Sequence, residues 1–374
     1  MEYAPCVPRR VILIVLDGCG AGATPDAERF SDHPTNHTLR NIHELRSLAS
    51  CPRLADCGFL ASTGLSPAGN ARYGRLQPLG EGKDSVTGHW EMMGARVTKP
   101  FPTFPQGFPT DLMRQFQQAI GRGTLGNKAA SGTAIIAELG EEHQRTGMPI
   151  VYTSADSVFQ IAAHEGTVPI DMLYEWCAIA RSLTDVQRVI ARPFAGEPGN
   201  YVRTERRRDF PLTPPPNLVD ELAAEFGQVH GIGVVPELFA GRGFRQVSRT
   251  QSNPQHFVAL LDALEHPTPF IFANFEDFDM KFGHRNDPLG FAQCLVEFDE
   301  MLGTIQSKLG ADDLLILTAD HGNDPTDEST DHTREFVPLA IIGQNVPAAD
   351  LQDRAGLDHI GKSVAAWLRE GVIR

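Results

Sequence analysis

The chain has 374 residues, of which 41% are hydrophobic and 21% charged, a composition typical of a globular protein with a sizeable core. Its formal net charge of −14 argues against a nucleic-acid or anionic-membrane partner, and a phosphorylated substrate would need local cations or metal ions. The six cysteines include no close metal-binding pair, so we expect reduced thiols in a cytoplasmic protein.

Short apolar runs predict buried strands, and the first of them is 11–16. This run ends at Asp17 and is too short for a signal peptide or a membrane span. Similar runs, rich in β-branched residues, follow at 149–153, 188–191, 270–274, 314–318 and 338–342. Helical patterns lie between many of them, at 111–120, 170–183, 217–226, 253–264, 289–309 and 360–369. This alternation predicts an α/β fold whose mostly parallel sheet is flanked by helices.

The middle of the chain differs in composition from the rest. Residues 99–109 (KPFPTFPQGFP) are rich in proline and phenylalanine, and residues 213–216 (TPPP) form a second proline cluster. Such clusters suit crossings between domains, because proline does not continue a helix or a central strand. We therefore expect an inserted domain at 100–215, within a discontinuous core made of 1–99 and 216–374.

Aspartates and histidines gather where the predicted strands end. Asp17, Asp279 and Asp320 each come shortly after an apolar run, and the carboxyl ends of parallel strands meet at one edge of a sheet. A lone Asp or His after a strand is usually a turn residue or a helix cap. Here, however, three histidines accompany the aspartates in tight Gly- and Asp-rich segments, namely His284, His321 and His332. Carboxylate and imidazole ligands together suit Mn²⁺ or Zn²⁺, so we expect a two-metal site able to support phosphoryl transfer.

The segment 82–91 (GKDSVTGHWE) contains a candidate nucleophile, Ser85. A serine hydroxyl is a poor nucleophile until a base or a metal activates it, and a helix start would favour a phosphate there. Taken by itself the segment is more typical of a capped turn, with Lys83 and Asp84 as a surface charge pair. It lacks the spacing of a Walker A loop.

Longer motifs reveal a family resemblance that runs from about residue 10 to residue 342. The motifs are VLDGCGAGATPDAE (15–28), GKDSVTGHWEMMG (82–94), GNKAASGT (126–133), VYTSADSVFQIAAHE (151–165), RVIARPFAGEPGN (188–200), DFDMKFGHRNDP (277–288) and TADHGNDPTDESTDHTREFVPL (318–339). Together they closely resemble the bacterial phosphopentomutases, which belong to the alkaline phosphatase superfamily with cofactor-independent phosphoglycerate mutase. The resemblance implies an alkaline-phosphatase-like core with an inserted α/β cap domain.

The same resemblance implies a role for each candidate residue. One Mn²⁺ would be held by Asp279, His284 and His332, and the other by Asp17, Asp320 and His321, with Zn²⁺ or Mg²⁺ as alternatives. Ser85 would carry the phosphoryl group, at a position where the family typically has threonine. The sugar-phosphate site of the cap would be lined by Ser154, Asp156, Arg188, Ile190 and Arg203, and arginine suits it because guanidinium binds phosphate oxygens bidentately.

The implied activity is that of an intramolecular phosphotransferase, which interconverts ribose 1-phosphate and ribose 5-phosphate and the 2-deoxyribose pair. The route would pass through phospho-Ser85 and a sugar 1,5-bisphosphate, which also acts as activator. Small sugar phosphates are the expected partners, without nucleic acid or membrane, and a monomer is the expected state. Val234 departs from the family, because a substrate-facing lysine is expected there. The alternative is therefore a mutase or phosphatase that acts on another sugar phosphate with the same two-metal core. A rival hypothesis of a different class is a non-catalytic metal-binding protein, in which Ser85 would have no special role.

Overall fold

The computed structural model describes residues 9–154 and 156–373, and the chain divides into two compact units. One unit comprises Met1–Lys99 and Pro214–Arg374, and the other is the inserted segment Pro100–Thr213. The chain therefore leaves the larger unit after Lys99 and returns to it within the proline cluster TPPP, two residues before the expected border. Each unit contains its own sheet.

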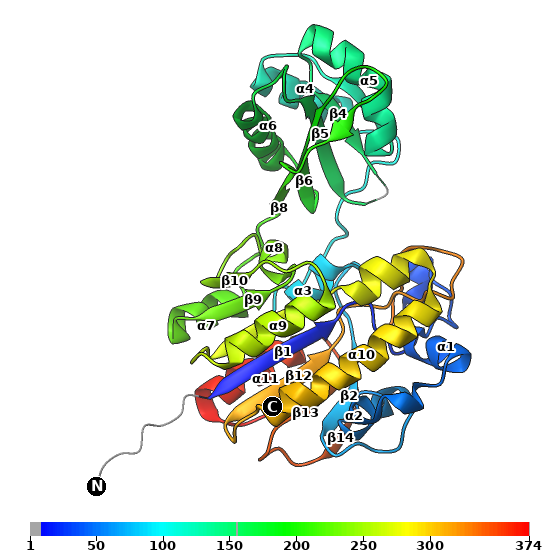
Figure 1. Cartoon of the computed structure of the whole chain (residues 1–374), viewed down its shortest axis with the longest axis vertical. Helices are drawn as coiled ribbons and strands as arrows, with labels where there is room; N and C mark the ends of the chain where they lie inside the picture. The colour runs from blue at the N-terminus through cyan, green and yellow to red at the C-terminus, as the bar shows by residue number, and fades with distance from the viewer. Residues whose placement is uncertain (1–8, 155, 374) are drawn as a thin grey trace. The chain divides into compact units, whose positions relative to one another are not determined.

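The larger unit is built on an eight-stranded sheet (Figure 1). Its strands lie in the order β10 (Gln246–Ser248), β9 (Val229–Ile232), β11 (Phe270–Phe275), β1 (Arg10–Leu16), β12 (Asp313–Thr318), β13 (Val337–Ile342), β2 (Arg72–Gln77) and β14 (Ala349–Ala355). The pairs β12–β13 and β13–β2 are antiparallel, and the other neighbouring pairs are parallel. The expected mostly parallel sheet is thereby confirmed.

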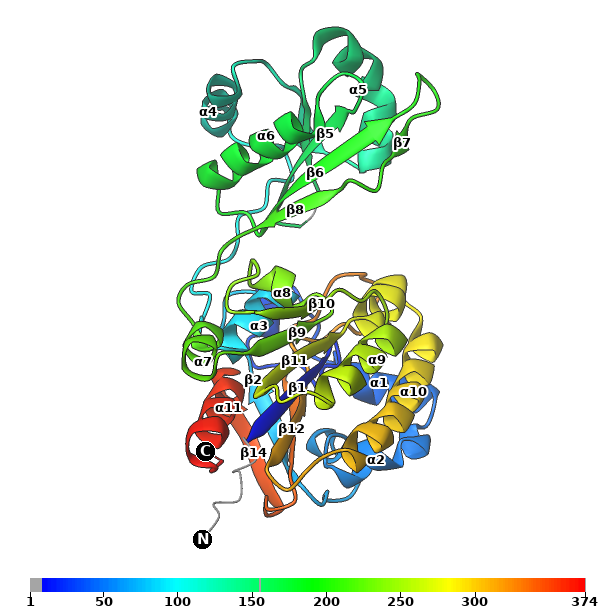
Figure 2. The same ribbon diagram turned by 60° about the vertical axis from the view of Figure 1, so that its left-hand side comes forward.

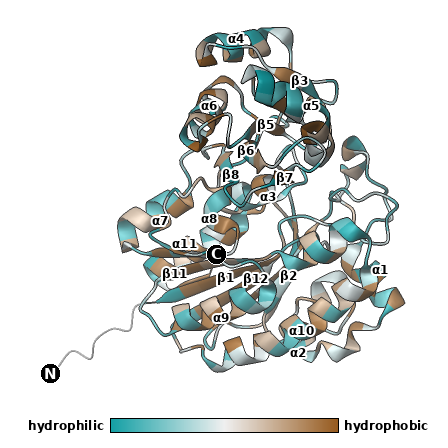
Figure 3. Cartoon of the chain, turned by 45° about the horizontal axis from the view of Figure 1, so that its top comes forward, coloured by the Kyte–Doolittle hydropathy of each residue, from teal (hydrophilic) through white to brown (hydrophobic). Residues whose placement is uncertain are grey.

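The central strands are apolar because both faces of the sheet are covered. Residues 11–16 of β1 are fully shielded from solvent, and Val11 pairs with Phe270 of β11 and with Leu314 of β12. Branched and aromatic side chains suit such doubly buried strands, whereas an alternating pattern would suit a sheet with one wet face. Figure 3 shows β1 and β12 in the brown of hydrophobic residues, between helices that also carry hydrophilic residues.

Helices lie on the two sides of this sheet, as Figure 2 shows. One layer contains α9 (Asn253–Leu264) and α10 (Pro288–Ser307), with α1 (Thr38–Leu45) and α2 (Pro52–Asp56) packed against α10. The other layer contains α3 (Ser85–Met92), α7 (Leu218–Phe226), α8 (Val235–Leu238) and α11 (Asp358–Glu370). Short 3₁₀ turns complete the unit at η1 (Ala27–Phe30), η2 (Leu48–Ser50), η3 (Ala61–Thr63) and η5 (Gly283–Arg285), with a π-helical turn at η4 (Phe278–Phe282).

The inserted unit is a smaller α/β sandwich. Its strands follow the order β3 (Leu125–Ala129), β4 (Ile150–Thr153), β5 (Val158–His164), β6 (Arg188–Ala195) and β7 (Val202–Arg203), and β8 (Arg208–Pro211) also pairs with β6. One apolar cluster packs the sheet against α4 (Thr110–Ile120) and α6 (Ile170–Leu183). A second cluster packs its other face against α5 (Gly132–Thr146).

The sequence patterns missed some elements. Strand β2 carries two arginines and β14 is largely exposed, so neither shows the apolar run that predicted the central strands. Strand β5 was also missed, because the polar Gln160 interrupts its otherwise apolar sequence. Strand β6 continues to Ala195, beyond the expected end at 191, because its pairing with β5 and β7 extends that far. No helix among the residues that the structure describes combines the length and the apolar character needed to cross a bilayer.

Candidate metal centre and nucleophile

The carboxyl ends of three neighbouring parallel strands bring three aspartates to one edge of the large sheet. Asp17 follows β1 directly, Asp320 lies two residues after β12, and Asp279 lies in η4, four residues after β11. All three are buried, with exposures of 3%, 2% and 5%. Buried carboxylates need compensating partners, and in this place a cation is the simplest one.

Asp17, Asp320 and His321 form one potential metal-binding group, in which one ligand atom of each lies within 4.8 Å of the others. His321 Nε2 is 3.4 Å from Asp17 Oδ1 and 3.3 Å from Asp320 Oδ2. The remaining carboxylate oxygens are held in place, because Asn274 Nδ2 donates to Asp17 Oδ2 (2.6 Å) and the Gly18 amide donates to Asp320 Oδ1 (3.2 Å). Each carboxylate therefore directs its other oxygen toward His321, into the space between the three side chains.

Asp279, His321 and His332 form a second group of the same kind. His332 Nε2 lies 3.4 Å from Asp279 Oδ1, and His284 Nε2 lies 3.2 Å from Asp279 Oδ2. The rings of His321 and His332 are 4.1 Å apart between centroids, so the two groups adjoin. The expected third ligand, His284, contacts Asp279 but does not belong to this group, which contains His321 in its place.

Backbone carbonyls set the orientation of two of these histidines. His321 Nδ1 lies 3.1 Å from the Gly322 carbonyl, and His284 Nδ1 lies 2.6 Å from the Thr330 carbonyl. A carbonyl oxygen only accepts, so Nδ1 must carry the proton in both rings. The Nε2 atoms therefore face the carboxylates, and Nε2 is the ring atom that would bind a metal.

The carboxylates themselves indicate that a cation fits here. Asp17 Oδ1 and Asp320 Oδ2 are buried and accept no hydrogen bond. Burial, together with the nearby charges of Asp320 and Asp279, raises the pKa of Asp17 well above its ordinary value. A divalent cation would coordinate the unpartnered oxygens and offset the repulsion between the acids. The mixed nitrogen and oxygen donors suit a metal such as Mn²⁺ or Zn²⁺.

Ser85 is the first residue of α3, and its hydroxyl lies beside the first group. Ser85 Oγ is 3.1 Å from His321 Nε2. Asp84 caps the helix, because its carboxylate accepts from the Thr87 amide (3.1 Å) and from the Thr87 hydroxyl (2.8 Å). His89 Nδ1 donates to the Ser85 carbonyl over 2.8 Å. The segment is therefore a capped helix start that also presents a hydroxyl to the potential ligands.

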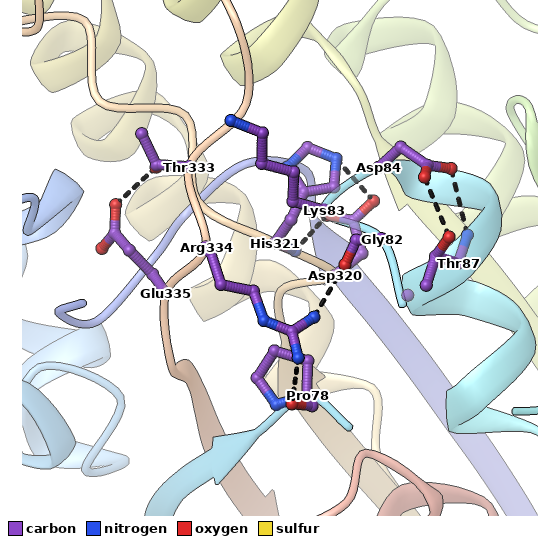
Figure 4. Close-up of a pocket in the computed structure, with 11 residues that line it drawn as sticks. Pro78, Gly82, Lys83, Asp84, Thr87, Asp320, His321, Thr333, Arg334 and Glu335 are labelled. Carbon is purple, nitrogen blue, oxygen red and sulfur yellow. Dashed lines mark hydrogen bonds and ion pairs between the residues drawn. The ribbon is translucent and has the colours of Figure 1, made fainter. Parts of the chain in front are cut away.

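A small pocket adjoins this helix start, as Figure 4 shows. It is lined by Lys83 and its neighbours, by Asp320 and His321, and by the segment that contains Arg334. Lys83 Nζ contacts Asp32 (2.7 Å) and Asp331 (3.1 Å). The ammonium group of Lys83, whose side chain is 17% exposed, therefore connects three separate segments of the chain.

A buried arginine anchors the loop that leads to Ser85. The guanidinium group of Arg334 donates to the carbonyls of Pro78 (2.7 Å), Gly80 (2.8 Å) and Gly82 (2.7 Å). Its side chain is only 2% exposed. Because one planar group satisfies three carbonyls, the path of the loop depends on it.

Sequence reasoning missed the side chains that orient the potential ligands. Asn323 Nδ2 donates to Asp279 Oδ1 (2.6 Å), as Asn274 does to Asp17. Asn274 is a fully buried polar residue within the apolar strand β11, and this interruption was the available signal. For Asn323 and Arg334 the only signal was their place inside a motif that already contained the potential ligands.

The five residues expected to line a sugar-phosphate site belong to the inserted unit. Ser154 and Asp156 follow β4, and Asp156 is exposed. Arg188 and the buried Ile190 lie two apart on β6, so they share one face of the sheet, and Arg203 is exposed on β7.

Val234 lies between β9 and α8, at the same edge of the large sheet as the aspartates, and is partly exposed. Gly233 before it has a φ of +74°, and a side chain at this glycine would approach Glu276 Oε2 to 2.8 Å. A carboxylate therefore lies beside this loop. Arg242, which follows α8 in the chain, is bound to Asp220 over 2.8 Å.

Comparison with known proteins identifies the family. A family model described as the Metalloenzyme superfamily matches residues 223–369, which include Asp279, Asp320 and the three histidines but not Ser85. The crystal structure of phosphoglycerate mutase from Leishmania mexicana has a TM-score of 0.51 at 13% identity, and the match covers 98% of this chain and 96% of that one. This likeness confirms the expected α/β fold.

Two relatives extend over nearly the whole chain. The phosphopentomutase of Caldanaerobacter subterraneus subsp. tengcongensis is 47% identical over 371 residues, which cover 97% of this chain and 94% of the relative. That of Carboxydothermus hydrogenoformans is 49% identical over 350 residues, covering 90% of each chain. Together with the metalloenzyme match, this similarity indicates a phosphomutase with divalent metal cofactors. The chain belongs to the phosphopentomutase family.

Proposed function

We propose that this chain interconverts ribose 1-phosphate and ribose 5-phosphate, and the corresponding 2-deoxyribose phosphates, with Ser85 as the phosphate carrier. The observation that carries the proposal is the position of Ser85 Oγ, 3.1 Å from His321 Nε2, beside two adjoining groups of potential metal ligands in a chain of this family. A hydroxyl at a helix start, next to cations, is where a phosphate is well stabilised.

The reaction would proceed in two transfers. A hydroxyl oxygen of the sugar monophosphate attacks the phosphorus of phospho-Ser85, the bond to Ser85 Oγ breaks, and a sugar 1,5-bisphosphate forms. Ser85 Oγ then attacks the other phosphorus, whose bond to the sugar oxygen breaks, which restores phospho-Ser85. The proton lost by the first hydroxyl is returned to the sugar oxygen released in the second transfer. The bisphosphate therefore also primes unphosphorylated enzyme and acts as an activator.

Two Mn²⁺ ions, or Zn²⁺ or Mg²⁺ in their place, are the cofactors that we propose for the two groups. Asp17, Asp320 and His321 would hold one ion; Asp279, His284 and His332 would hold the other. When bound, such ions stabilise the charge on the oxygens of a transferring phosphoryl group. The protein's own contribution is to fix the ligands through Asn274, Asn323 and the carbonyls that orient the histidines, so that little reorganisation is needed.

The inserted unit would serve as a cap that binds the sugar phosphate and excludes water from the phosphoenzyme. Its separate core and its proline-rich borders support this role. Ser154, Asp156, Arg188, Ile190 and Arg203 would line the cap side of the site. We further propose a cytoplasmic protein, because the five described cysteines are free, as thiols are in a reducing compartment. A monomer is the oligomeric state that we propose.

The test is turnover of purified protein with Mn²⁺ on ribose 1-phosphate, ribose 5-phosphate, glucose 1-phosphate and 3-phosphoglycerate. Isomerisation of the pentose phosphates is expected, and release of free phosphate would instead identify a phosphatase. After incubation with a sugar bisphosphate, intact mass should show one added phosphate on the wild type and none on Ser85→Ala. Ser85→Thr is the matched control, because it keeps the hydroxyl and should keep turnover. Normal turnover by Ser85→Ala would refute the assigned nucleophile.

A second candidate, a mutase for another sugar phosphate, is favoured by one observation. Val234 offers no cation, and Glu276 lies beside the same loop. A carboxylate repels a phosphate and accepts hydrogen bonds from hydroxyls, so a substrate with an uncharged group at this position would fit better. A kcat/KM for glucose 1-phosphate above that for ribose 1-phosphate in the same assay would favour this candidate.

A further inference from the structure

Glu335 is a fully buried carboxyl group to which the two proposed transfers give no role. It lies two residues before β13, and its exposed fraction is 0%. Its Oε2 accepts from the amides of Gly22 (2.9 Å) and Thr38 (3.0 Å). Its Oε1 accepts from the hydroxyls of Thr38 (2.7 Å) and Thr333 (2.7 Å), and Figure 4 draws the second of these bonds. The carboxyl group is therefore fully hydrogen-bonded, and its partners come from separate segments of the chain.

These partners belong to the segments that carry potential metal ligands. Gly22 lies in the loop that follows β1, and Thr333 comes directly after a histidine of the second metal group. Thr333 also forms an isolated β-bridge with Gly322, in which the two residues exchange backbone hydrogen bonds of 3.0 and 2.7 Å. Gly322 in turn follows the histidine that the two groups share. One carboxyl group therefore connects the segments that contain Asp17, His321 and His332.

Two glycines let the backbone approach this carboxyl group closely. A side chain at Gly20 would collide with Glu335 Oε2, and a side chain at Gly322 would collide with Glu335 Oε1. The carboxyl group cannot move aside without loss, because its hydrogen bonds hold both oxygens. The absence of a Cβ at these two positions therefore allows the loops after β1 and β12 to pack directly against Glu335.

We propose that Glu335 is a positioning residue for both metal groups, whose carboxyl group fixes the spacing of the segments that bring Asp17, His321 and His332 together. Its hydrogen bonds go to the backbone and to threonine hydroxyls of these segments and of α1, so it acts on the ligands through the chain that carries them. The inference rests on the proposed function for the metal ions, but not for the sugar phosphate. Groups that orient metal ligands set the affinity for the ion, because a displaced ligand coordinates less well.

Two substitutions separate positioning from simple attraction between charges. Glu335→Asp keeps the negative charge but shortens the side chain by a methylene group, so its carboxylate cannot reach all the partners. Glu335→Gln keeps the length: its carbonyl oxygen can accept from the two amides, and its NH₂ group can donate to the two hydroxyls. Burial raises the pKa of Glu335 to about 7, which indicates that a neutral side chain is tolerated at this place.

The affinity of the full chain for Mn²⁺, measured by chelator competition, tests the proposal. Glu335→Asp should weaken Mn²⁺ binding about ten- to a hundredfold, whereas Glu335→Gln should bind close to the wild type. Glu91→Asp is the matched control, because Glu91 is also buried (2% exposed) and its carboxylate accepts from the amides of residues 79, 80 and 357. None of these three amides belongs to a segment with a potential metal ligand, so this variant should lose thermal stability without losing Mn²⁺ affinity.

Hydrogen exchange of the metal-free chain tests the same contacts without any ion. In Glu335→Asp the amides of Gly22 and Thr38 lose their acceptor, so both should exchange faster, as should Thr333 across the bridge. Glu335→Gln and Glu91→Asp should leave exchange at these three amides unchanged.

The outcomes distinguish this inference from the proposed function. Equal Mn²⁺ affinity for Glu335→Asp and Glu91→Asp would overturn the role of Glu335, as would unchanged exchange at Gly22 and Thr38 in Glu335→Asp. Tighter Mn²⁺ binding by Glu335→Asp than by Glu335→Gln would assign the effect to charge and would equally refute positioning. If the wild type binds Mn²⁺ but converts no pentose phosphate, the proposed function fails, while a loss of affinity confined to Glu335→Asp still supports the inference.

Discussion

Replacing Arg334 by methionine should destabilise the larger unit and slow turnover together. The side chain is 2% exposed and donates to three carbonyls within 2.7–2.8 Å, and it also pairs with Asp26 over 3.1 Å. Methionine fills similar volume but leaves these carbonyls and the acid without their partner. Removing one partner from a buried ionic network costs about 3–5 kcal/mol. Because the three carbonyls belong to the loop before Ser85, the loss should also displace the hydroxyl from His321 and lower kcat.

The assay is urea unfolding, combined with hydrogen exchange of the amides at 78–84. Arg29→Met is the control, because Arg29 also lies near Asp26 (3.9 Å) and binds Glu81 of the same loop through its carboxylate (3.0 Å), but its side chain is 62% exposed and reaches none of the three carbonyls. An exposed pair of this kind contributes about 0–1 kcal/mol. Arg334→Lys should recover only part of the lost stability, because a compact ammonium group cannot donate to all three carbonyls as the planar guanidinium group does. An unfolding midpoint for Arg334→Met equal to that of Arg29→Met, with unchanged exchange at 78–84, would refute the reasoning.

Three further outcomes are expected. Burial and two nearby arginines lower the pKa of His37 to about 4. The unfolded chain therefore takes up the proton first as the pH falls below about 6.5, and about 3 kcal/mol of stability present above that pH should be lost toward pH 4. His37→Asn, which keeps an N-cap acceptor, should flatten that part of the pH–stability curve, and an unchanged slope would contradict this. Asn323→Ala should weaken metal binding about ten- to a hundredfold in a chelator competition. Asn41→Ala, which removes a hydrogen bond to Asp324 and none to Asp279, should not. Val234→Lys should raise kcat/KM for ribose 5-phosphate about tenfold or more with unchanged metal content, and identical kinetics would show that another group already supplies the charge.

The strands of the core and the chemistry of the site were predictable because both depend on local patterns. A run such as 11–16 must be buried on both faces, since six consecutive apolar side chains leave no wet face. An aspartate directly after such a run then lies at the carboxyl edge of the sheet, whatever the order of the strands. Six potential ligands could therefore be named from the segments that follow the strands, whereas the role of Ser85 came from the family resemblance. The structure gathers all seven residues at one place.

The tertiary structure decided what depends on contacts between distant segments. Asn274 reaches Asp17 across 257 positions, and Arg334 closes a loop more than 250 positions away, so no local pattern indicates either contact. The same holds for His321, which adjoins both groups of potential ligands because two strand ends and a later loop converge on it. Composition and periodicity determine which residues must be buried or lie at a strand end. Which polar groups then satisfy one another is decided only when the chain has folded, because each buried donor must find an acceptor within hydrogen-bond distance in three dimensions.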